Sequence, residues 1–261
     1  MRKLNLNFSY LFEGKVWNII SSSDQSLLIE VRHPDQFVVE YSLLDLNKEA
    51  FVFEGLRFEE NWWISAAHIH NDNALFYTYG GKDNPDYKDF FSYSISAEKV
   101  IWTQEDVRLL KAVNDRLLFE IKGKEEQLTL GLVSGNEVGS IVDDEHRNKS
   151  IVQPFYYQQN TKHFETVHKF IQKKWQIESE KGVHYFENET FVIISYYYAE
   201  NKGLTNNLVV MDRQGNLLLQ EVIGKDLPGI ADDTFFIYDD QLIFVKENSE
   251  LFVYQLLMAD V

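Results

Sequence analysis

The chain has 261 residues with 41 acidic against 25 basic side chains, a formal net charge of −16 that repels phosphate backbones and argues against a nucleic-acid partner. Hydrophobic residues make up 44% of the chain, which is enough for a core and excludes global disorder. The absence of cysteine excludes disulfides, thiolate zinc sites and cysteine nucleophiles.

The N-terminal segment predicts a β-strand. Its apolar residues alternate along the chain and therefore share one strand face: Leu4, Leu6, Phe8, Tyr10 and Phe12. The segment lacks the apolar run and the small-residue cleavage site of a signal peptide. No stretch approaches the roughly 20 apolar residues that span a bilayer. We therefore expect a cytoplasmic protein without a membrane partner.

A short pattern recurs along the chain, in which an Asp or Asn opens a tight turn and an apolar strand follows. It begins at Asp24, Asp72, Asp115, Asn188 and Asp240. Such a side chain can accept a hydrogen bond from the backbone two residues on. The strands that follow are too apolar to keep one face in water, so we expect them to lie between neighbouring sheets. A further predicted strand precedes each turn, starting at Val16, Trp62, Val107, Val183 and Asp233.

The intervals between these turns are 48, 43, 73 and 52 residues in the printed sequence, and four-stranded propeller blades recur every ~40–50 residues. The sequence therefore predicts an all-β fold, a small β-propeller of about five four-stranded blades that forms a single domain over residues 1–261. The last turn is followed by too few strands for a full blade. We expect the N-terminal strand to complete that blade and to close the ring.

The interval 143–181 breaks the repeat and predicts an insert. After a polar opening, residues 151–159 suit an edge strand, and a sixth blade is the alternative if this stretch and its neighbours pair into a sheet. A helix is predicted over 162–174, with Asn160 or Thr161 as its N-cap. The apolar residues at helical spacing are Phe164, Val167, Ile171 and Trp175.

Polar side chains on two predicted strands are candidates for binding. His68 and His70 share a strand face at a spacing that metal ligands use, but no third ligand is identifiable. We therefore expect no metal and interpret both histidines as lining a wet channel or as hydrogen-bonded structural residues. Arg32 has the geometry to bind a carboxylate with two hydrogen bonds. The alternative is an ion pair with Glu30, which lies on the same strand face.

Aromatic pairs provide the remaining candidates. Trp62 and Trp63 point to opposite faces if they lie in a strand, and Tyr196 and Tyr197 do the same. One member of each pair can then floor a surface for a sugar or a peptide, whereas a core role is the alternative for both pairs. The candidate ligand-binding residues are Arg32, Trp62, Trp63, His68, His70, Tyr196 and Tyr197.

Signatures of common catalytic sites are missing from the chain. Neighbouring carboxylates occur at 59–60, 232–233 and 239–240, but all lie at predicted turns, where acidic residues serve turn chemistry. There is no GxSxG elbow, phosphate-binding loop, GxGxxG or HExxH motif. The sequence identifies no catalytic residue and implies no cofactor.

Two resemblances support the fold. The strand–turn–strand segments at 44–53, 93–102 and 211–215 resemble the repeats of quinoprotein-type and WD-like propellers. Segments along nearly the whole chain resemble an uncharacterised bacterial family of propeller-like proteins; they are KVWNIISS, LLIEVR, the Trp62–Trp63 pair, HFETVHKFI, IISYYY and DTFFIYDDQLIFV. These resemblances imply a propeller and assign no residue roles, and no quinone cofactor is carried over.

Function is expected to reside in loops and exposed strand residues. The leading hypothesis is a non-enzymatic propeller that binds a protein or a small molecule. One alternative is a hydrolase-like or sugar-active propeller enzyme with its site at the central channel. A degenerate cofactor-binding propeller is the other.

Overall fold

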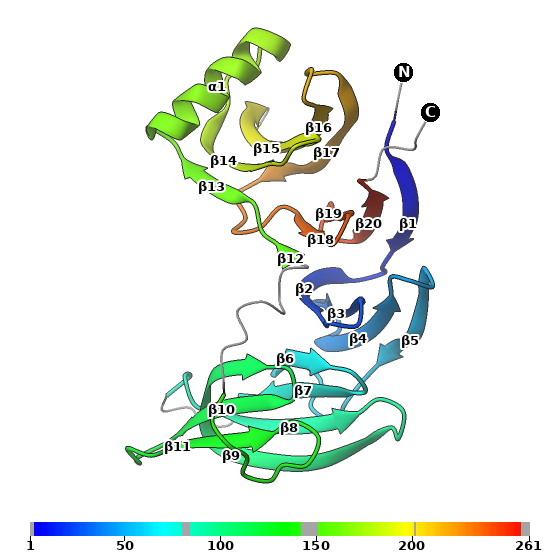
Figure 1. The fold of residues 1–261 in the computed structure, drawn as a ribbon, viewed down its shortest axis with the longest axis vertical. Helices are drawn as coiled ribbons and strands as arrows, with labels where there is room; N and C mark the ends of the chain where they lie inside the picture. The colour runs from blue at the N-terminus through cyan, green and yellow to red at the C-terminus, as the bar shows by residue number, and fades with distance from the viewer. Residues whose placement is uncertain (1–2, 80–83, 142–150, 201, 257–261) are drawn as a thin grey trace. The chain divides into compact units, whose positions relative to one another are not determined.

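The computed structural model describes residues 3–79, 84–141, 151–200 and 202–256. The described strands pair into four antiparallel sheets of four to six strands, and the described part of the chain contains one helix (Figure 1). The chain divides into two compact units. Unit 1 comprises Met1–Phe12 and Lys149–Val261, and unit 2 comprises Glu13–Asn148.

Unit 2 begins with a four-stranded sheet whose strands follow one another in chain order. They are β2 (Lys15–Ser21), β3 (Ser26–His33), β4 (Val38–Asp45) and β5 (Ala50–Leu56). Every residue of β3 from Ser26 to Arg32 is buried, as expected for a strand with sheet neighbours and both faces covered. The turn at Asp24 precedes this strand, as the recurrent pattern predicts.

The second sheet of unit 2 has six strands, also in chain order. They are β6 (Ile64–His70), β7 (Asn73–Thr78), β8 (Lys88–Ser94), β9 (Lys99–Val113), β10 (Arg116–Ile121) and β11 (Gln127–Gly131). The long strand β9 pairs with β8 from Lys99 to Val107 and with β10 from Val107 to Val113. Asp106, in the left-handed region at φ 51°, lies beside this change of partner.

The prediction of about five four-stranded blades is therefore met only in part. All five turn-initiated strands are present, but those that follow Asp72 and Asp115 belong to one sheet. The reason is β9, which is continuous where a blade boundary was expected. It is the fourth strand of one group (β6–β9) and the first strand of another (β9–β11).

Two hydrophobic clusters hold unit 2 together. In the first, Leu28 and Tyr41 of the four-stranded sheet pack against residues of β6 and β7 such as Phe76. In the second, Leu75 on the other face of β7 packs with Leu117 and other residues of β10 and β11. Strand β7 is consequently buried on both faces, with the six-stranded sheet folded over at β9.

Unit 1 contains the other two sheets. The first has the order β1–β20–β19–β18–β12: β1 (Asn5–Leu11), β20 (Glu250–Gln255), β19 (Gln241–Lys246), β18 (Phe236–Tyr238) and β12 (Ile151–Val152). The second has the order β13–β14–β15–β16–β17: β13 (Phe155–Gln158), β14 (Glu180–Glu187), β15 (Phe191–Glu200), β16 (Gly203–Asp212) and β17 (Leu217–Leu227). Strand β1 pairs with β20, so the N-terminal strand does complete the C-terminal sheet as predicted. Closure of a ring stays a prediction.

Residues 151–159 form two short edge strands in two sheets instead of the single edge strand predicted, and they add no sixth blade, because both sheets already contain a strand that follows one of the recurrent turns. Ile151–Val152 pairs with β18 in one sheet, whereas Phe155–Gln158 pairs with β14 in the other. Pro154 lies between the two pieces. It has no N–H to donate and restricts the residue before it, so the strand is interrupted there and the chain passes from one sheet to the next.

The helix α1 (Lys162–Trp175) agrees with the prediction over 162–174 to within one residue. Its N-cap is Thr161, whose hydroxyl accepts a hydrogen bond from Phe164 N at 3.3 Å. Together with Val167 and Ile171, Phe164 packs on one face of the β13–β17 sheet (Figure 1). The other face of that sheet packs on the β1–β20 sheet. The start of the predicted insert, 143–150, lies outside the described residues.

Turn chemistry explains where several strands start. Asn188 Oδ1 accepts hydrogen bonds from Thr190 N at 2.9 Å and Phe191 N at 2.7 Å, as the recurrent pattern predicts. At three other turns the residue immediately before the predicted Asp has a left-handed backbone; these residues are Asn71, Asn114 and Asp239. Asn and Asp tolerate this conformation better than other non-glycine residues, which favours tight hairpins at these points.

Candidate functional site

A buried ion pair lies at the centre of the candidate site in unit 2. Arg32 and Glu30 are two residues apart on β3 and share a strand face, and Arg32 Nε donates to Glu30 Oε1 over 2.8 Å. The second carboxylate oxygen of Glu30 accepts hydrogen bonds from Ser65 Oγ at 2.5 Å and from Ala66 N at 3.3 Å. The pairing that the sequence offered as the alternative for Arg32 is therefore present.

The guanidinium of Arg32 also organises the chain that enters β6. Its two terminal nitrogens donate to Ile64 O at 3.0 Å and to Trp62 O at 3.4 Å. The same group lies 4.9 Å from the ring centroid of Trp17 and 5.2 Å from that of Trp62. A cation between two indoles is stabilised by both ring faces. Arg32 thus fixes the positions of two tryptophans.

Aromatic side chains lie around Arg32, and we call them the aromatic surface: the exposed Trp17, Phe37, Trp63 and Tyr79 and the partly buried Trp62. Trp17, Phe37 and Trp63 are each more than 60% exposed. Ring contacts join Phe37 to Trp62 at 5.4 Å and Trp63 to Tyr79 at 6.0 Å. Exposed apolar clusters of this kind are uncommon unless another molecule covers them.

The turn that presents the two adjacent tryptophans is fixed by Glu60. Its Oε1 accepts hydrogen bonds from the backbone N–H of Trp62 at 2.9 Å and of Trp63 at 2.8 Å. Both tryptophans therefore precede β6 rather than lying within a strand. Trp62 is partly buried against the cluster that joins the two sheets of unit 2, whereas Trp63 faces solvent.

Lys88 adds a second cation beside the aromatic surface. Its Nζ lies 4.0 Å from the ring centroid of Tyr77 and 5.3 Å from that of Tyr79. A hydrogen bond with Tyr77 and partial burial raise the pKa of Tyr79 above its ordinary value. The surface thus combines aromatic faces, phenol groups and a cation.

One buried hydroxyl near the ion pair has no partner. Tyr41 lies directly opposite Glu30 in the pairing of β3 with β4, and its Oη makes no hydrogen bond within the described structure. Burial, followed by the neighbouring carboxylate of Glu30, raises the pKa of Tyr41 far above its ordinary value. The phenol is therefore an uncharged, unsatisfied donor in the core.

The hydrogen-bond partners of His68 and His70 lie outside the aromatic surface. His68 Nε2 is 2.8 Å from Asn114 O, and burial lowers the pKa of His68. His70 lies near Ser23 Oγ, at 3.5 Å from its Nδ1. Among residues 3–79, 84–141, 151–200 and 202–256, no three His, Asp or Glu side chains are grouped to hold a metal ion.

The structure places Tyr196 and Tyr197 in the interior of unit 1. Asn207 Nδ2 donates to Tyr196 Oη over 2.6 Å, and Tyr196 stacks near Trp175 of α1. Tyr197 Oη accepts a hydrogen bond from Ala231 N at 3.0 Å. Both side chains are at most 1% exposed, so neither meets a ligand at the surface. Of the seven candidates, Arg32, Trp62 and Trp63 are brought together.

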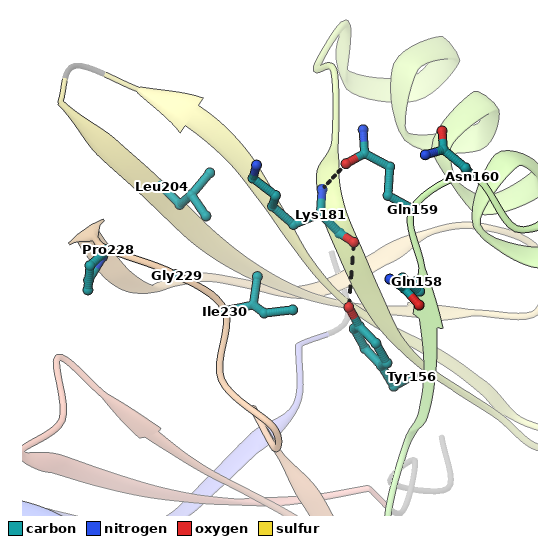
Figure 2. Close-up of a pocket in the computed structure, with 9 residues that line it drawn as sticks. All are labelled: Tyr156, Gln158, Gln159, Asn160, Lys181, Leu204, Pro228, Gly229 and Ile230. Atoms are coloured by element: carbon teal, nitrogen blue, oxygen red, sulfur yellow. Dashed lines mark hydrogen bonds between the residues drawn. The ribbon is translucent and has the colours of Figure 1, made fainter.

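Sequence reasoning missed Trp17 and Phe37. Trp17 belongs to the largely apolar segment Val16–Ile20, and nothing in this segment indicates exposure. Phe37 carried a usable signal, because an aromatic residue directly after the turn HPDQ is unlike ordinary turn chemistry. In the structure its φ is 54°, which is unusual for a bulky side chain. A second missed feature is a pocket in unit 1 around Tyr156 and Lys181, which Figure 2 shows.

Several solved structures resemble the chain at low identity. An acylaminoacyl peptidase from Pyrococcus horikoshii is 14% identical, with 88% of this chain and 34% of that chain covered and a TM-score of 0.34. The β-propeller domain of the Trilobed protease from Pyrococcus furiosus is 13% identical, with 94% and 70% covered and a TM-score of 0.32. An uncharacterized protein from Listeria monocytogenes is 9% identical, with 95% and 82% covered and a TM-score of 0.30. The chain spans about a third of the peptidase.

The family comparison is more specific. Residues 20–102 match the profile of a family described as a domain of unknown function (DUF4905). The predicted resemblance to an uncharacterised family is confirmed over this stretch, which includes Arg32, Trp62 and Trp63. No curated protein matches the chain. None of the helical residues described here forms a segment with the length and apolar character needed to cross a bilayer.

Proposed function

We propose that the chain is a non-enzymatic binding module of the β-propeller class, and that the aromatic surface of unit 2 contacts a segment of a protein partner. The propeller assignment is supported by successive antiparallel sheets that pack face to face within each unit. Binding through exposed residues at turns and strand ends is how such scaffolds ordinarily carry function.

A single observation carries the binding proposal: the guanidinium of Arg32 is held between Trp17 and Trp62, with Trp63 exposed beside them. Trp, Tyr and Arg are the residues that dominate the energy of protein interfaces. Here their positions are set before binding by the Glu30 ion pair and the Glu60 turn, so a partner would not have to order them. A buried and paired Arg32 is itself ill suited to capture a free carboxylate, which favours an apolar or aromatic contact over an ionic one.

The test is selection of peptides from an immobilised random library by the full chain, followed by affinity measurements on the selected peptides. Because truncation of an interface tryptophan removes about 2 kcal/mol or more of binding free energy, Trp63→Ala is expected to weaken binding by about thirtyfold or more. Val100→Ala is the matched control, since Val100 is exposed on β9 and belongs to no part of the aromatic surface.

Two results would count against the proposal. One is the failure of the wild-type chain to select any peptide. The other is an equal loss of affinity in Trp63→Ala and Val100→Ala. Circular dichroism and the thermal midpoint of each variant ensure that the comparison is made between folded proteins.

A further inference from the structure

A pocket of 390 Å³ lies in unit 1, formed by segments that are distant in sequence. One wall is the end of β13 and the turn into α1, including Gln158, Gln159 and Asn160. Lys181 near the start of β14 lies beside it, and the loop that follows β17 forms the opposite side (Figure 2). None of these residues belongs to the aromatic surface of unit 2. The volume lies in the range of small-molecule sites, ~300–1,000 Å³.

The β13–β14 side of the pocket is fixed by close contacts. Lys181 N donates to Gln159 Oε1 over 3.0 Å, and Gln159 N donates to Lys181 O over 2.9 Å. The ring of Tyr156 lies directly over Gly182, where a Cβ atom would approach the ring to 2.4 Å. Glycine at this position therefore allows Tyr156 to lie flat along the strand at the pocket.

The loop on the opposite side is hydrogen-bonded to strands β14 and β15 of the sheet. Tyr197 Oη accepts a hydrogen bond from Ala231 N at 3.0 Å, and the ring of His184 bonds to Asp232 O at 2.8 Å. These contacts fix the loop immediately after Ile230, which lines the pocket. Both walls are thus held by hydrogen bonds before any ligand arrives.

The charge of the lining is unusual for this chain. Among the described residues, Lys181 is the one charged residue that lines the pocket and no lining residue is acidic, although the whole chain carries a net charge of −16. Within the described structure, Lys181 Nζ has no carboxylate partner and makes no hydrogen bond. Asp226 and Asp232 flank the loop in sequence without lining the pocket.

The other lining groups indicate which chemical groups a bound anionic ligand carries besides its negative charge. Three consecutive carboxamides offer donors and acceptors suited to hydroxyl groups. The Tyr156 ring, together with Leu204 and Ile230, provides surfaces against which C–H groups pack. A fatty acid would leave the carboxamides unused, and a neutral sugar would leave the ammonium group unused. We propose that this pocket binds a sugar acid, a pyranose that carries a carboxylate, with the carboxylate on Lys181 and the hydroxyls on the amide side chains.

The test is titration of the full chain with glucuronate by isothermal calorimetry, with glucose as the uncharged comparison. Saturable binding of glucuronate is expected, with glucose weaker by about tenfold, the value of one charge-assisted hydrogen bond of about 1.4 kcal/mol. Lys181→Gln should reduce the affinity for glucuronate by a similar factor and leave that for glucose nearly unchanged. Lys169→Gln, which alters an exposed lysine of α1, is the matched control and should bind like the wild type.

The proposal is overturned by any of three results: no saturable heat with glucuronate, equal affinity for glucose and glucuronate, or equal losses in Lys181→Gln and Lys169→Gln. If Lys181→Gln is poorly folded, Gln158→Ala provides a second test of the same wall, since Gln158 lines the pocket from β13 and has no left-handed backbone to strain. That variant should weaken both sugars, because it removes a hydroxyl partner and retains the cation.

Discussion

Arg32 Nε donates to Glu30 Oε1 over 2.8 Å from two positions further along the same strand, and both side chains are buried. The relationship joins stability to the candidate site, since the same guanidinium lies against Trp17 and Trp62. A complete buried ion pair adds little net stability to a fold, because the cost of desolvation offsets the attraction. The loss of one partner, however, leaves a costly uncompensated charge.

Arg32→Met is accordingly expected to lower the free energy of unfolding by about 3–5 kcal/mol, because it leaves the Glu30 carboxylate buried with only neutral donors. The double variant Glu30→Gln/Arg32→Met should recover most of that loss. Urea denaturation measures both. A loss near that of an exposed ion pair, about 0–1 kcal/mol, would show that the pair is not desolvated as the structure has it.

Tyr41→Phe is expected to leave stability unchanged or to raise it, because it removes a buried hydroxyl that has no hydrogen-bond partner. Tyr196→Phe is the matched comparison. It should cost about 1 kcal/mol, because Asn207 Nδ2 then loses the acceptor that it reaches at 2.6 Å. Thermal unfolding of the two variants gives the comparison, and a larger loss for Tyr41→Phe would contradict it.

The chain should lose stability on mild acidification through His184 and His68. Burial is the main cause that lowers the pKa of each below the ordinary value of 6.5. The unfolded chain therefore binds protons more readily, and stability that is fully present above about pH 6.5 falls as the pH drops toward the folded pKa values. His184→Gln, which keeps a donor for Asp232 O, should reduce the fall in thermal midpoint between about pH 7.5 and about pH 5.5.

An exposed histidine provides the control for that experiment. His163 is exposed on α1, and the thermal midpoint of His163→Gln should depend on pH as that of the wild type does. Identical pH profiles for the wild type and His184→Gln would contradict the assignment of the effect to this buried ring.

Gly203→Ala is expected to destabilise the chain by about 1–3 kcal/mol, the usual cost of forcing extra atoms into a packed site. A Cβ atom at Gly203 would lie 2.7 Å from the backbone of Asp226, which has little freedom to move. Gly229→Ala is the control, because a Cβ there meets nothing within 4 Å. Urea midpoints of the two variants should differ clearly, and equal midpoints would disprove the close approach.

Local chemistry made much of the fold predictable. The starts of β3, β7, β10, β15 and β19 follow from Asp and Asn turns, and α1 follows from its cap and from apolar spacing. The pairing of strands into sheets was harder to predict. Whether β9 ends a sheet or continues into the next group depends on long-range pairing, which no local pattern contains. The effect of Pro154 was readable in principle, since proline interrupts a strand wherever it occurs.

The candidate site shows the same division. The Glu30–Arg32 pair follows from a spacing of two residues on one strand, and the sequence contained it as an alternative. Whether Trp17 and Trp63 are exposed depends on which neighbours cover them, and this is decided by sheets formed far along the chain. The unit 1 pocket escaped prediction because its walls come from separate segments that meet only after folding.

The position of α1 on the β13–β17 sheet has a consequence for assembly. A sheet with an uncovered apolar face invites a further layer, whether from the same chain or from a neighbouring molecule. Phe164, Val167 and Ile171 occupy that face, and the β1–β20 sheet occupies the opposite one. The helix therefore covers an apolar sheet face that would otherwise be free to bind a neighbouring molecule.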